Sequence, residues 1–149
     1  MQYKYPLFFL ALLISSFTFA QEQNEILKSI LKAEEFVLLE KNDSALLQIK
    51  DLDISNRVTR IQKIASNNNP TYLDYYKFIG VVGNKPGRDY ALVSNYINKN
   101  IPEPTSDKIN INYVKIKWLQ ASSLRNEKTI AEANVENDKL KRYIDKFDS

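Results

Sequence analysis

The chain has 149 residues, of which 21 are Lys or Arg, 18 are Asp or Glu, and none is His or Cys. This length suits a single domain. Without His or Cys, the chain lacks a Ser-His-Asp triad, an imidazole or thiolate metal site, a thiolate nucleophile and a disulfide framework. Beyond residue 20 the chain has 20 basic and 18 acidic residues, and this net charge of +2 is too balanced to indicate nucleic acid or an anionic membrane as a partner.

The first twenty residues have the three parts of a secretory signal peptide. Lys4 supplies a short positive region, residues 7–14 form an apolar run, and residues 15–20 are smaller and more polar. Thr18 and Ala20 fit the small-residue rule, which predicts cleavage after Ala20. The apolar run is shorter than the roughly 20 residues that a spanning helix needs. We therefore expect an exported protein, periplasmic or extracellular, without a stable membrane span after cleavage. The competing interpretation is an uncleaved N-terminal anchor.

Residues 21–149 are expected to form one helical domain, because helix-breaking residues are confined to its middle. All three glycines lie between Gly80 and Gly87, and every proline beyond position 20 lies between Pro70 and Pro104. Long stretches without Gly or Pro favour helices.

Apolar residues at helical spacing predict the individual helices. The predicted segments cover residues 22–41, 45–49, 58–65, 71–82, 88–100, 107–125 and 128–147. Asn42-Asp43-Ser44 offers capping oxygens for the second segment, Ser55 or Asn56 for the third, and Pro102 ends the fifth. Residues 72–82 have the composition of a strand, which makes α+β the competing class, but their tyrosines follow a helical stripe. We therefore predict an all-α fold of antiparallel helix pairs.

A weak internal repeat aligns three alanines, Ala45, Ala91 and Ala133. Twelve residues before them stand Ala33, Ile79 and Ala121, and fifteen residues before them stand the bulky Ile30, Tyr76 and Trp118. A helical hairpin needs large side chains where one helix faces its neighbour and small ones where the backbones approach closely. The copies would cover residues 22–69, 70–104 and 105–149.

The middle copy carries a family resemblance. Tyr76-x-x-Ile79-Gly80 looks like the aromatic-x-x-Leu-Gly start of a tetratricopeptide repeat, Gly87 falls at its turn, Tyr96 at its second-helix aromatic and Pro104 at its closing proline. The chain thus resembles the tetratricopeptide-repeat family of α-solenoids, with an irregular helical bundle as the alternative. The resemblance implies stacked helix pairs that bind a protein or peptide on a concave face, and no catalysis.

Three tyrosines of the middle copy are the candidate partner-binding residues, namely Tyr72, Tyr75 and Tyr90. An exposed tyrosine gives a large contact area at low entropic cost. The alternative is that all three belong to the core, which is also where we expect Trp118.

The last predicted helix has a second candidate function, self-association. Its residues Ile130, Ala133, Asn137, Leu140, Ile144 and Phe147 alternate at spacings of three and four. This spacing places Asn137 among apolar neighbours, and a buried Asn at such a position can set register and oligomeric state. A homodimer through Ile130, Asn137, Leu140 and Ile144 is therefore a further expectation. The alternative is packing against residues 107–125, where Ile111, Val114, Trp118 and Ala121 have the same spacing.

Two loops are superficially similar to ligand-binding motifs. Asp51, Asp53 and Ser55 resemble the start of a calcium loop, but its twelfth position is the neutral Gln62 rather than Glu. We therefore favour a helix cap at Ser55 or Asn56. Residues 80–88 resemble a phosphate-binding loop, but Lys-Ser or Lys-Thr does not follow the last glycine. We expect a turn there, and we expect no metal or other cofactor.

Paired carboxylates leave a small hydrolase as the alternative function. Glu34-Glu35 and Glu136/Asp138 supply such pairs. Neighbours one or two apart on a helix point in different directions, and we therefore expect solvated faces at both places. The sequence favours a protein-binding module over an enzyme.

Overall fold

The computed structural model describes residues 5–84, 87, 89–126 and 129–148, and these contain seven α-helices and no β-strand. The helices are α1 (Tyr5–Leu38), α2 (Asn42–Ile49), α3 (Asn56–Ala65), α4 (Tyr72–Gly83), α5 (Tyr90–Asn100), α6 (Ile111–Asn126) and α7 (Ile130–Asp145). The predicted all-α class is confirmed. The α+β alternative is wrong, because the segment of strand-like composition forms α4.

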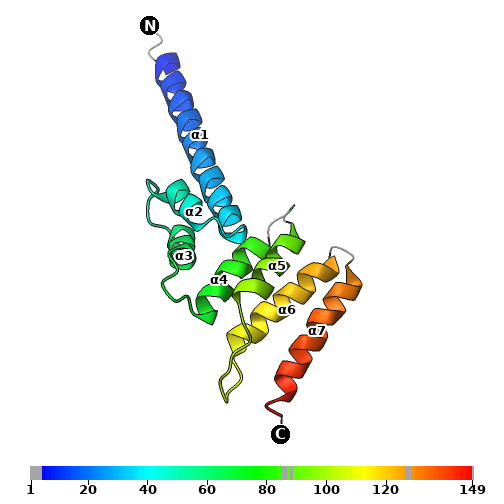
Figure 1. Ribbon diagram of the computed structural model, residues 1–149. Coiled ribbons are helices and arrows are strands. Elements are labelled where there is room, and N and C mark those ends of the chain that lie inside the picture. The colour runs from blue at the N-terminus through cyan, green and yellow to red at the C-terminus, as the bar shows by residue number, and fades with distance from the viewer. Residues whose placement is uncertain (1–4, 85–86, 88, 127–128, 149) are drawn as a thin grey trace.

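The helices are arranged in space in chain order, from α1 at one end to α7 at the other (Figure 1). Each helix contacts the next one, and α1 also contacts α3 and α5, while α4 also contacts α6. This pattern fits a helical bundle made of neighbouring helix pairs. The tetratricopeptide-like repeat remains a prediction.

Helix α1 runs without a break through the expected cleavage position at Ala20. Its N-terminal part extends away from the other helices (Figure 1). Among the described residues, no helix combines the length and hydropathy needed to cross a membrane. The signal peptide and its cleavage remain predictions.

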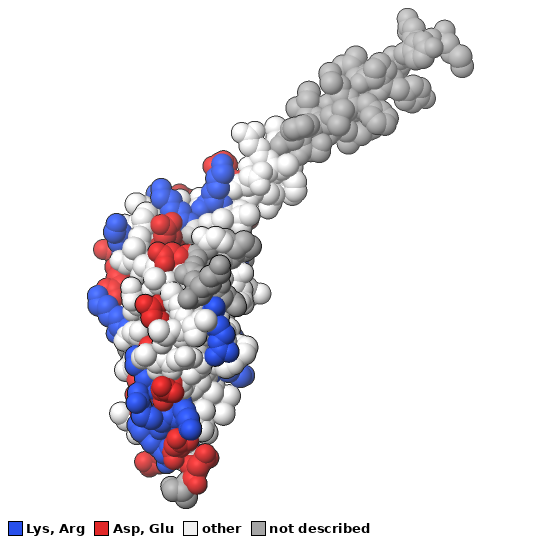
Figure 2. Space-filling view, turned by 90° about the vertical axis from the view of Figure 1, so that its right-hand side faces the viewer, with Lys and Arg blue, Asp and Glu red and all other residues white. Residues whose placement is uncertain are grey.

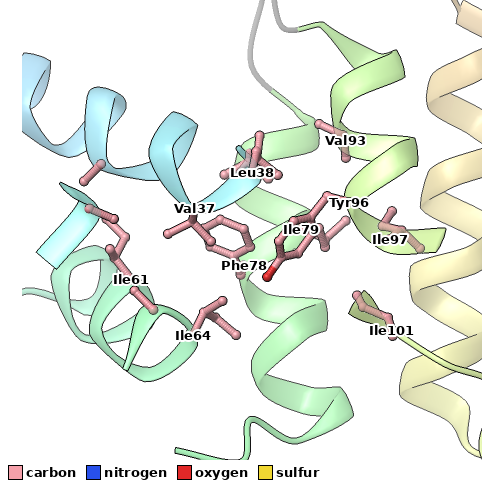
Figure 3. Close-up of a cluster of buried hydrophobic side chains, with 14 of the residues drawn as sticks. Val37, Leu38, Ile61, Ile64, Phe78, Ile79, Val93, Tyr96, Ile97 and Ile101 are labelled. Atoms are coloured by element: carbon pink, nitrogen blue, oxygen red, sulfur yellow. The ribbon is translucent and has the colours of Figure 1, made fainter. Parts of the chain in front are cut away.

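Apolar stripes from successive helices meet in one core. Figure 3 shows Val37, Ile61, Phe78 and Ile97, from α1, α3, α4 and α5, pointing into the same cluster. All four are almost completely buried. Burying a side chain of this size contributes about 1.5–3 kcal/mol to stability, and this core therefore fixes how the middle helices lie against one another.

Side-chain caps define where three helices begin. Ser55 accepts a hydrogen bond from the Val58 N–H at 3.3 Å, as predicted for α3. Thr71 and Asp74 form a reciprocal capping box at the start of α4, and Asp89 caps α5. The predicted cap of α2 is wrong, because the helix already begins at Asn42 and its N-cap residue has no side-chain cap.

The three copies of the predicted repeat differ in burial. The aligned Ala45 and Ala133 are fully buried, but Ala91 is exposed. Only the position twelve residues earlier is buried in every copy, at Ala33, Ile79 and Ala121. Close backbone approach at the aligned alanine is therefore not a common feature of the three helix pairs.

Candidate functional site

The exposed side of α6 presents the largest aromatic side chain of the protein to solvent. Trp118 is 60% exposed, and Ile111, two turns earlier on the same face, is also exposed. The expectation that Trp118 lies in the core is wrong. Because α6 contacts α4, α5 and α7, its buried side is broad and includes Tyr113, Ile116 and Gln120. Of the predicted stripe, Ile111 and Trp118 lie on the opposite side, whereas Val114 is half-buried and Ala121 is buried.

A cation–π contact joins this exposed side of α6 to α4. The Lys115 Nζ lies 5.3 Å from the centre of the Tyr76 ring, a contact that contributes about 0.5–1 kcal/mol at an exposed site. Leu73 and Lys77 of α4 are exposed on the adjoining turn. Around Gly80 there is open space, since a Cβ added there would meet no atom within 4 Å.

We call this surface the α4–α6 face and define it by Leu73, Tyr76, Lys77, Ile111, Lys115 and Trp118. Its charges are of one sign. The charged residues of α6 are all basic. In α4 the one acidic residue, Asp74, is engaged by Thr71 in the capping box, at 2.8 Å from both the Thr71 N–H and its hydroxyl. Elsewhere, basic and acidic side chains are interspersed over much of the surface, and one edge carries few charges (Figure 2).

The predicted tyrosine site is divided between two ends of the α4–α5 pair. Tyr72 and Tyr75 lie in the first turn of α4, and Tyr90 begins α5. Ten residues of helix, about 15 Å, separate Tyr90 from the end of α5, which lies beside Tyr72 and Tyr75 in one groove. All three tyrosines are half-buried.

Tyr72 is held by contacts within the molecule. Its hydroxyl donates a hydrogen bond to the carbonyl oxygen of Pro102 at 2.9 Å. Its ring meets Tyr113 edge-on, with ring centres 5.9 Å apart. Burial raises the pKa of both Tyr72 and Tyr75, so both hydroxyls are protonated at neutral pH.

Next to these tyrosines are two adjoining cavities of about 330 and 220 Å³, which share Asn67, Tyr75 and Asn100. We call them together the Asn–Tyr groove, which Asn69, Tyr72 and Pro102 also line. Its charged wall residue, Glu40, is paired with Lys99 and accepts a hydrogen bond from Asn100 at 2.9 Å. The hydrogen bonds from Lys99 and Asn100 lower the pKa of Glu40, which therefore carries its negative charge at neutral pH. Lys99 balances that charge.

A buried polar network joins α5, α6 and α7. Lys117 Nζ donates to Glu136, Gln120 and Asn98, the last at 3.2 Å. Gln120 in turn donates to the Ser94 hydroxyl at 2.7 Å. Burial lowers the pKa of Lys117, with the hydrogen bond to Glu136 opposing the change. For Glu136, burial acts to raise the pKa, but hydrogen bonds from Lys117 and Lys139 outweigh it and bring the pKa below its ordinary value.

A second buried carboxylate, Glu34, lies between α1 and α3. Arg57 donates to both of its oxygens, with three contacts of 2.9–3.0 Å. The expectation of solvated faces is therefore wrong for Glu34 and Glu136, while Glu35 and Asp138 are exposed. Both buried carboxylates bind basic side chains, and this pairing is what permits their burial.

The residues predicted for self-association do not share one environment. Ile130 is 59% exposed, Leu140 is buried, and Asn137 and Ile144 are half-buried. The buried positions of α7 are Ala133, Glu136, Leu140 and Tyr143. Glu136 thus takes the buried position predicted for Asn137, because Lys117 of α6 lies opposite it.

The two loops that resemble ligand-binding motifs contain a helix cap and a turn glycine. The Ser55 hydroxyl of the calcium-like segment is engaged in the α3 cap. In the part of the chain that the structure describes, no three His, Cys, Asp or Glu side chains converge to hold a metal ion. Of the phosphate-loop-like stretch, residues 85, 86 and 88 lie outside the described residues, and Gly87 has a left-handed φ of 72°. This φ suits the predicted turn.

No family model matches this sequence, and neither a curated protein nor a solved structure matches it at a significant level. What the protein binds must therefore be inferred from its own residues.

Proposed function

We propose that this chain is an exported, tetratricopeptide-like helical protein that binds a partner protein or peptide through the α4–α6 face and catalyses no reaction. The observation that carries the proposal is the exposure of Trp118 on a helix whose other sides are packed. Tryptophan is enriched at the centres of protein interfaces, where its burial supplies much of the binding energy. An exposed Trp beside an exposed Ile and a half-buried Tyr is therefore suited to a partner.

The charges of the face define the chemistry of that partner. Lys77 and Lys115 are exposed on the same two helices as the exposed apolar residues Leu73, Ile111 and Trp118. A partner segment with acidic residues around an apolar anchor would match both features. The acidic residues would favour association and orientation, and burial of the anchor would supply affinity. The open space at Gly80 would allow close approach of the partner backbone.

Helix order supports the same surface. In a stack of helix pairs, the first helices of successive pairs lie side by side and line one face. Helices α4 and α6 are the first members of the pairs α4–α5 and α6–α7, and they contact each other. The α4–α6 face would then belong to the concave surface of such a stack.

A cross-linking pull-down from the extracytoplasmic fraction tests the proposal. The wild-type protein should capture a reproducible set of proteins, and Trp118→Ala should lose them, because a hot-spot truncation costs about 2 kcal/mol or more. Lys115→Glu should also weaken capture, and the effect should be larger at low ionic strength than at high ionic strength. The matched control is Leu47→Ala on α2, because Leu47 is also exposed, at 65%, but lies outside the α4–α6 face. Equal capture by wild type and a folded Trp118→Ala variant would refute the proposed surface.

Export is tested separately by intact-mass spectrometry of protein recovered outside the cytoplasm. The expected mass lacks residues 1–20. A mass that includes them would contradict cleavage after Ala20.

Self-association through α7 is a second candidate function, favoured by the exposure of Ile130 next to the half-buried Asn137 and Ile144. Sedimentation equilibrium should then give a dimer that Ile130→Glu converts to a monomer. A wild-type monomer at all accessible concentrations would contradict it.

A further inference from the structure

We propose that the Asn–Tyr groove binds a neutral saccharide. This inference is independent of the proposed protein-binding function, because Trp118 and the other residues of the α4–α6 face do not line the groove. It starts from the composition of the walls, which Asn67, Asn69 and Asn100 line together with Tyr72 and Tyr75.

The side chains of the walls match the chemistry of a sugar ring. A carboxamide both donates and accepts hydrogen bonds, so Asn67 and Asn69 can serve a hydroxyl group in either role. Asn100 donates to Glu40 and to the Tyr96 carbonyl, and it can therefore offer a ligand its amide oxygen. Tyrosine supplies an apolar ring face together with a hydroxyl, and a pyranose ring likewise has an apolar C–H face bordered by hydroxyls. Charged ligands fit less well, because Glu40 is already neutralised by Lys99 and an added charge would have no counter-ion in the groove.

The backbone around the groove is held in place before any ligand arrives. Among the described residues, the three non-glycine residues with left-handed φ are Glu40, Asn67 and Asn69, at 60°, 54° and 46°. All three line the groove. Glu40 and Asn67 each stand directly after the C-cap of a helix, where a left-handed residue is common. The ends of α1 and α3 thus give this part of the groove a defined backbone.

Hydrogen bonds at the end of α1 enforce the conformation of Glu40. The N–H of Glu40 donates to Val37 at 3.0 Å, and the N–H of Lys41 donates to Phe36 at 2.8 Å. These bonds close the end of α1 as a Schellman motif. On the opposite wall, the bond from Tyr72 to Pro102 fixes the loop after α5. A preorganised wall reduces the entropy that a ligand must overcome to bind.

The size of the groove limits the ligand. Its larger cavity, about 330 Å³, lies near the lower end of the range of roughly 300–1,000 Å³ found for small-molecule sites. The smaller cavity continues from it past Tyr75 and Asn100. This shape suits one or two sugar rings rather than a long oligosaccharide held at many subsites.

Nuclear magnetic resonance titration of the ¹⁵N-labelled protein tests the inference. The probes are maltose, cellobiose and di-N-acetylchitobiose as neutral disaccharides, glucuronic acid as an anionic sugar, and capped trialanine as a neutral peptide. We expect at least one neutral disaccharide to shift the side-chain amide signals of Asn67, Asn69 and Asn100 saturably. The indole signal of Trp118 should stay in place and serves as an internal control.

Variants identify the groove as the site. Asn69→Ala and Tyr75→Ala should each weaken the binding of that disaccharide by about tenfold or more, the equivalent of one lost contact worth about 1.4 kcal/mol. Tyr90→Ala, at the other end of α5, is the matched control and should bind like wild type. Asn69 is exposed, and its variant therefore keeps the test valid if Tyr75→Ala does not fold.

Three results would overturn the inference. The first is that no neutral disaccharide gives a saturable shift. The second is that a folded Asn69→Ala variant binds as tightly as wild type. The third is that capped trialanine or glucuronic acid shifts the same signals with equal or higher affinity, which would assign the groove to a peptide backbone or to an anionic ligand. Loss of protein capture on Trp118→Ala is unaffected by any of them.

Discussion

Replacing Lys117 by Met should destabilise the protein by about 3–5 kcal/mol. The side chains of Lys117 and Glu136 are only 5% and 6% exposed. Removing one partner of such a buried pair leaves the other charge with much less compensation, and a loss of this kind costs about 3–5 kcal/mol. The variant would leave the Glu136 carboxylate buried with Lys139 as its remaining basic neighbour. Since domains of this size are commonly stable by only about 5–15 kcal/mol, the loss is large enough to measure.

Urea denaturation followed by circular dichroism measures this free energy of unfolding. The matched control is Lys139→Met, because Lys139 donates to the same carboxylate at 2.7 Å but is 46% exposed. Exposed ion pairs contribute about 0–1 kcal/mol, and the control should therefore differ little from wild type. The double variant Lys117→Met/Glu136→Leu removes both buried charges and should be more stable than Lys117→Met alone.

The reasoning is refuted if the free energy of unfolding of Lys117→Met lies within about 1 kcal/mol of that of wild type. It is also refuted if the destabilisation of the double variant equals the sum of those caused by Lys117→Met alone and Glu136→Leu alone. Either result would mean that the two buried charges do not depend on each other.

The pH dependence of stability follows from the same pair. Because the pKa of Glu136 is lower in the folded protein than its ordinary value of about 4.3, its contribution to stability is fully present above that value. The contribution is lost as the pH falls through the lower, folded pKa. Wild type should therefore lose more stability between about pH 5 and pH 3 than Glu136→Gln does. Parallel curves of the free energy of unfolding against pH for the two proteins would contradict a stabilising role of the Glu136 carboxylate. Other carboxylates with lowered pKa, such as Glu40, act equally in both.

Two further changes test local features of the fold. Arg57→Leu should lower the free energy of unfolding by about 3 kcal/mol, because it removes the bidentate partner of Glu34, which is only 2% exposed. A urea midpoint like that of wild type would be inconsistent with a stabilising ion pair. Thr71→Ala removes the hydroxyl of the α4 capping box and should lower the free energy of unfolding, measured by thermal denaturation, by about 1 kcal/mol. The control is Thr59→Ala, which removes a hydroxyl that donates to the Ser55 carbonyl and should lower the free energy of unfolding by less.

Periodicity predicted the helices well where a segment has a single apolar side. In α3, the buried residues Val58, Ile61, Ile64 and Ala65 are also its only apolar residues, so one pattern specifies both the helix and its inner face. In α6, apolar residues surround the axis, from Ile111 and Tyr113 to Ile116 and Trp118. Such a pattern predicts a helix but does not select which side is buried. The predicted inner face of α6 was therefore right at Ala121 and wrong at Ile111 and Trp118.

The buried charges could not be predicted from local patterns for a different reason. Lys, Glu and Gln are almost always found on the surface unless paired, and their pairing depends on residues far apart in the chain. Lys117 and Glu136 are 19 residues apart and on different helices. Their burial follows from the way α6 and α7 pack, which no spacing within either helix specifies.

The tyrosine stripe of α4 illustrates how one helix serves two surfaces. Tyr75 and Tyr76 are neighbours, but about 100° of helical rotation separates them, so Tyr75 lines the Asn–Tyr groove while Tyr76 meets Lys115 on the α4–α6 face. A single stripe in the sequence is thus divided between two surfaces of different chemistry, each of which is a proposed site. Both sites depend on the first turns of α4, which the capping box of Thr71 and Asp74 holds. Thr71→Ala should therefore weaken both sites together, whereas Asn69→Ala and Trp118→Ala should each weaken only one.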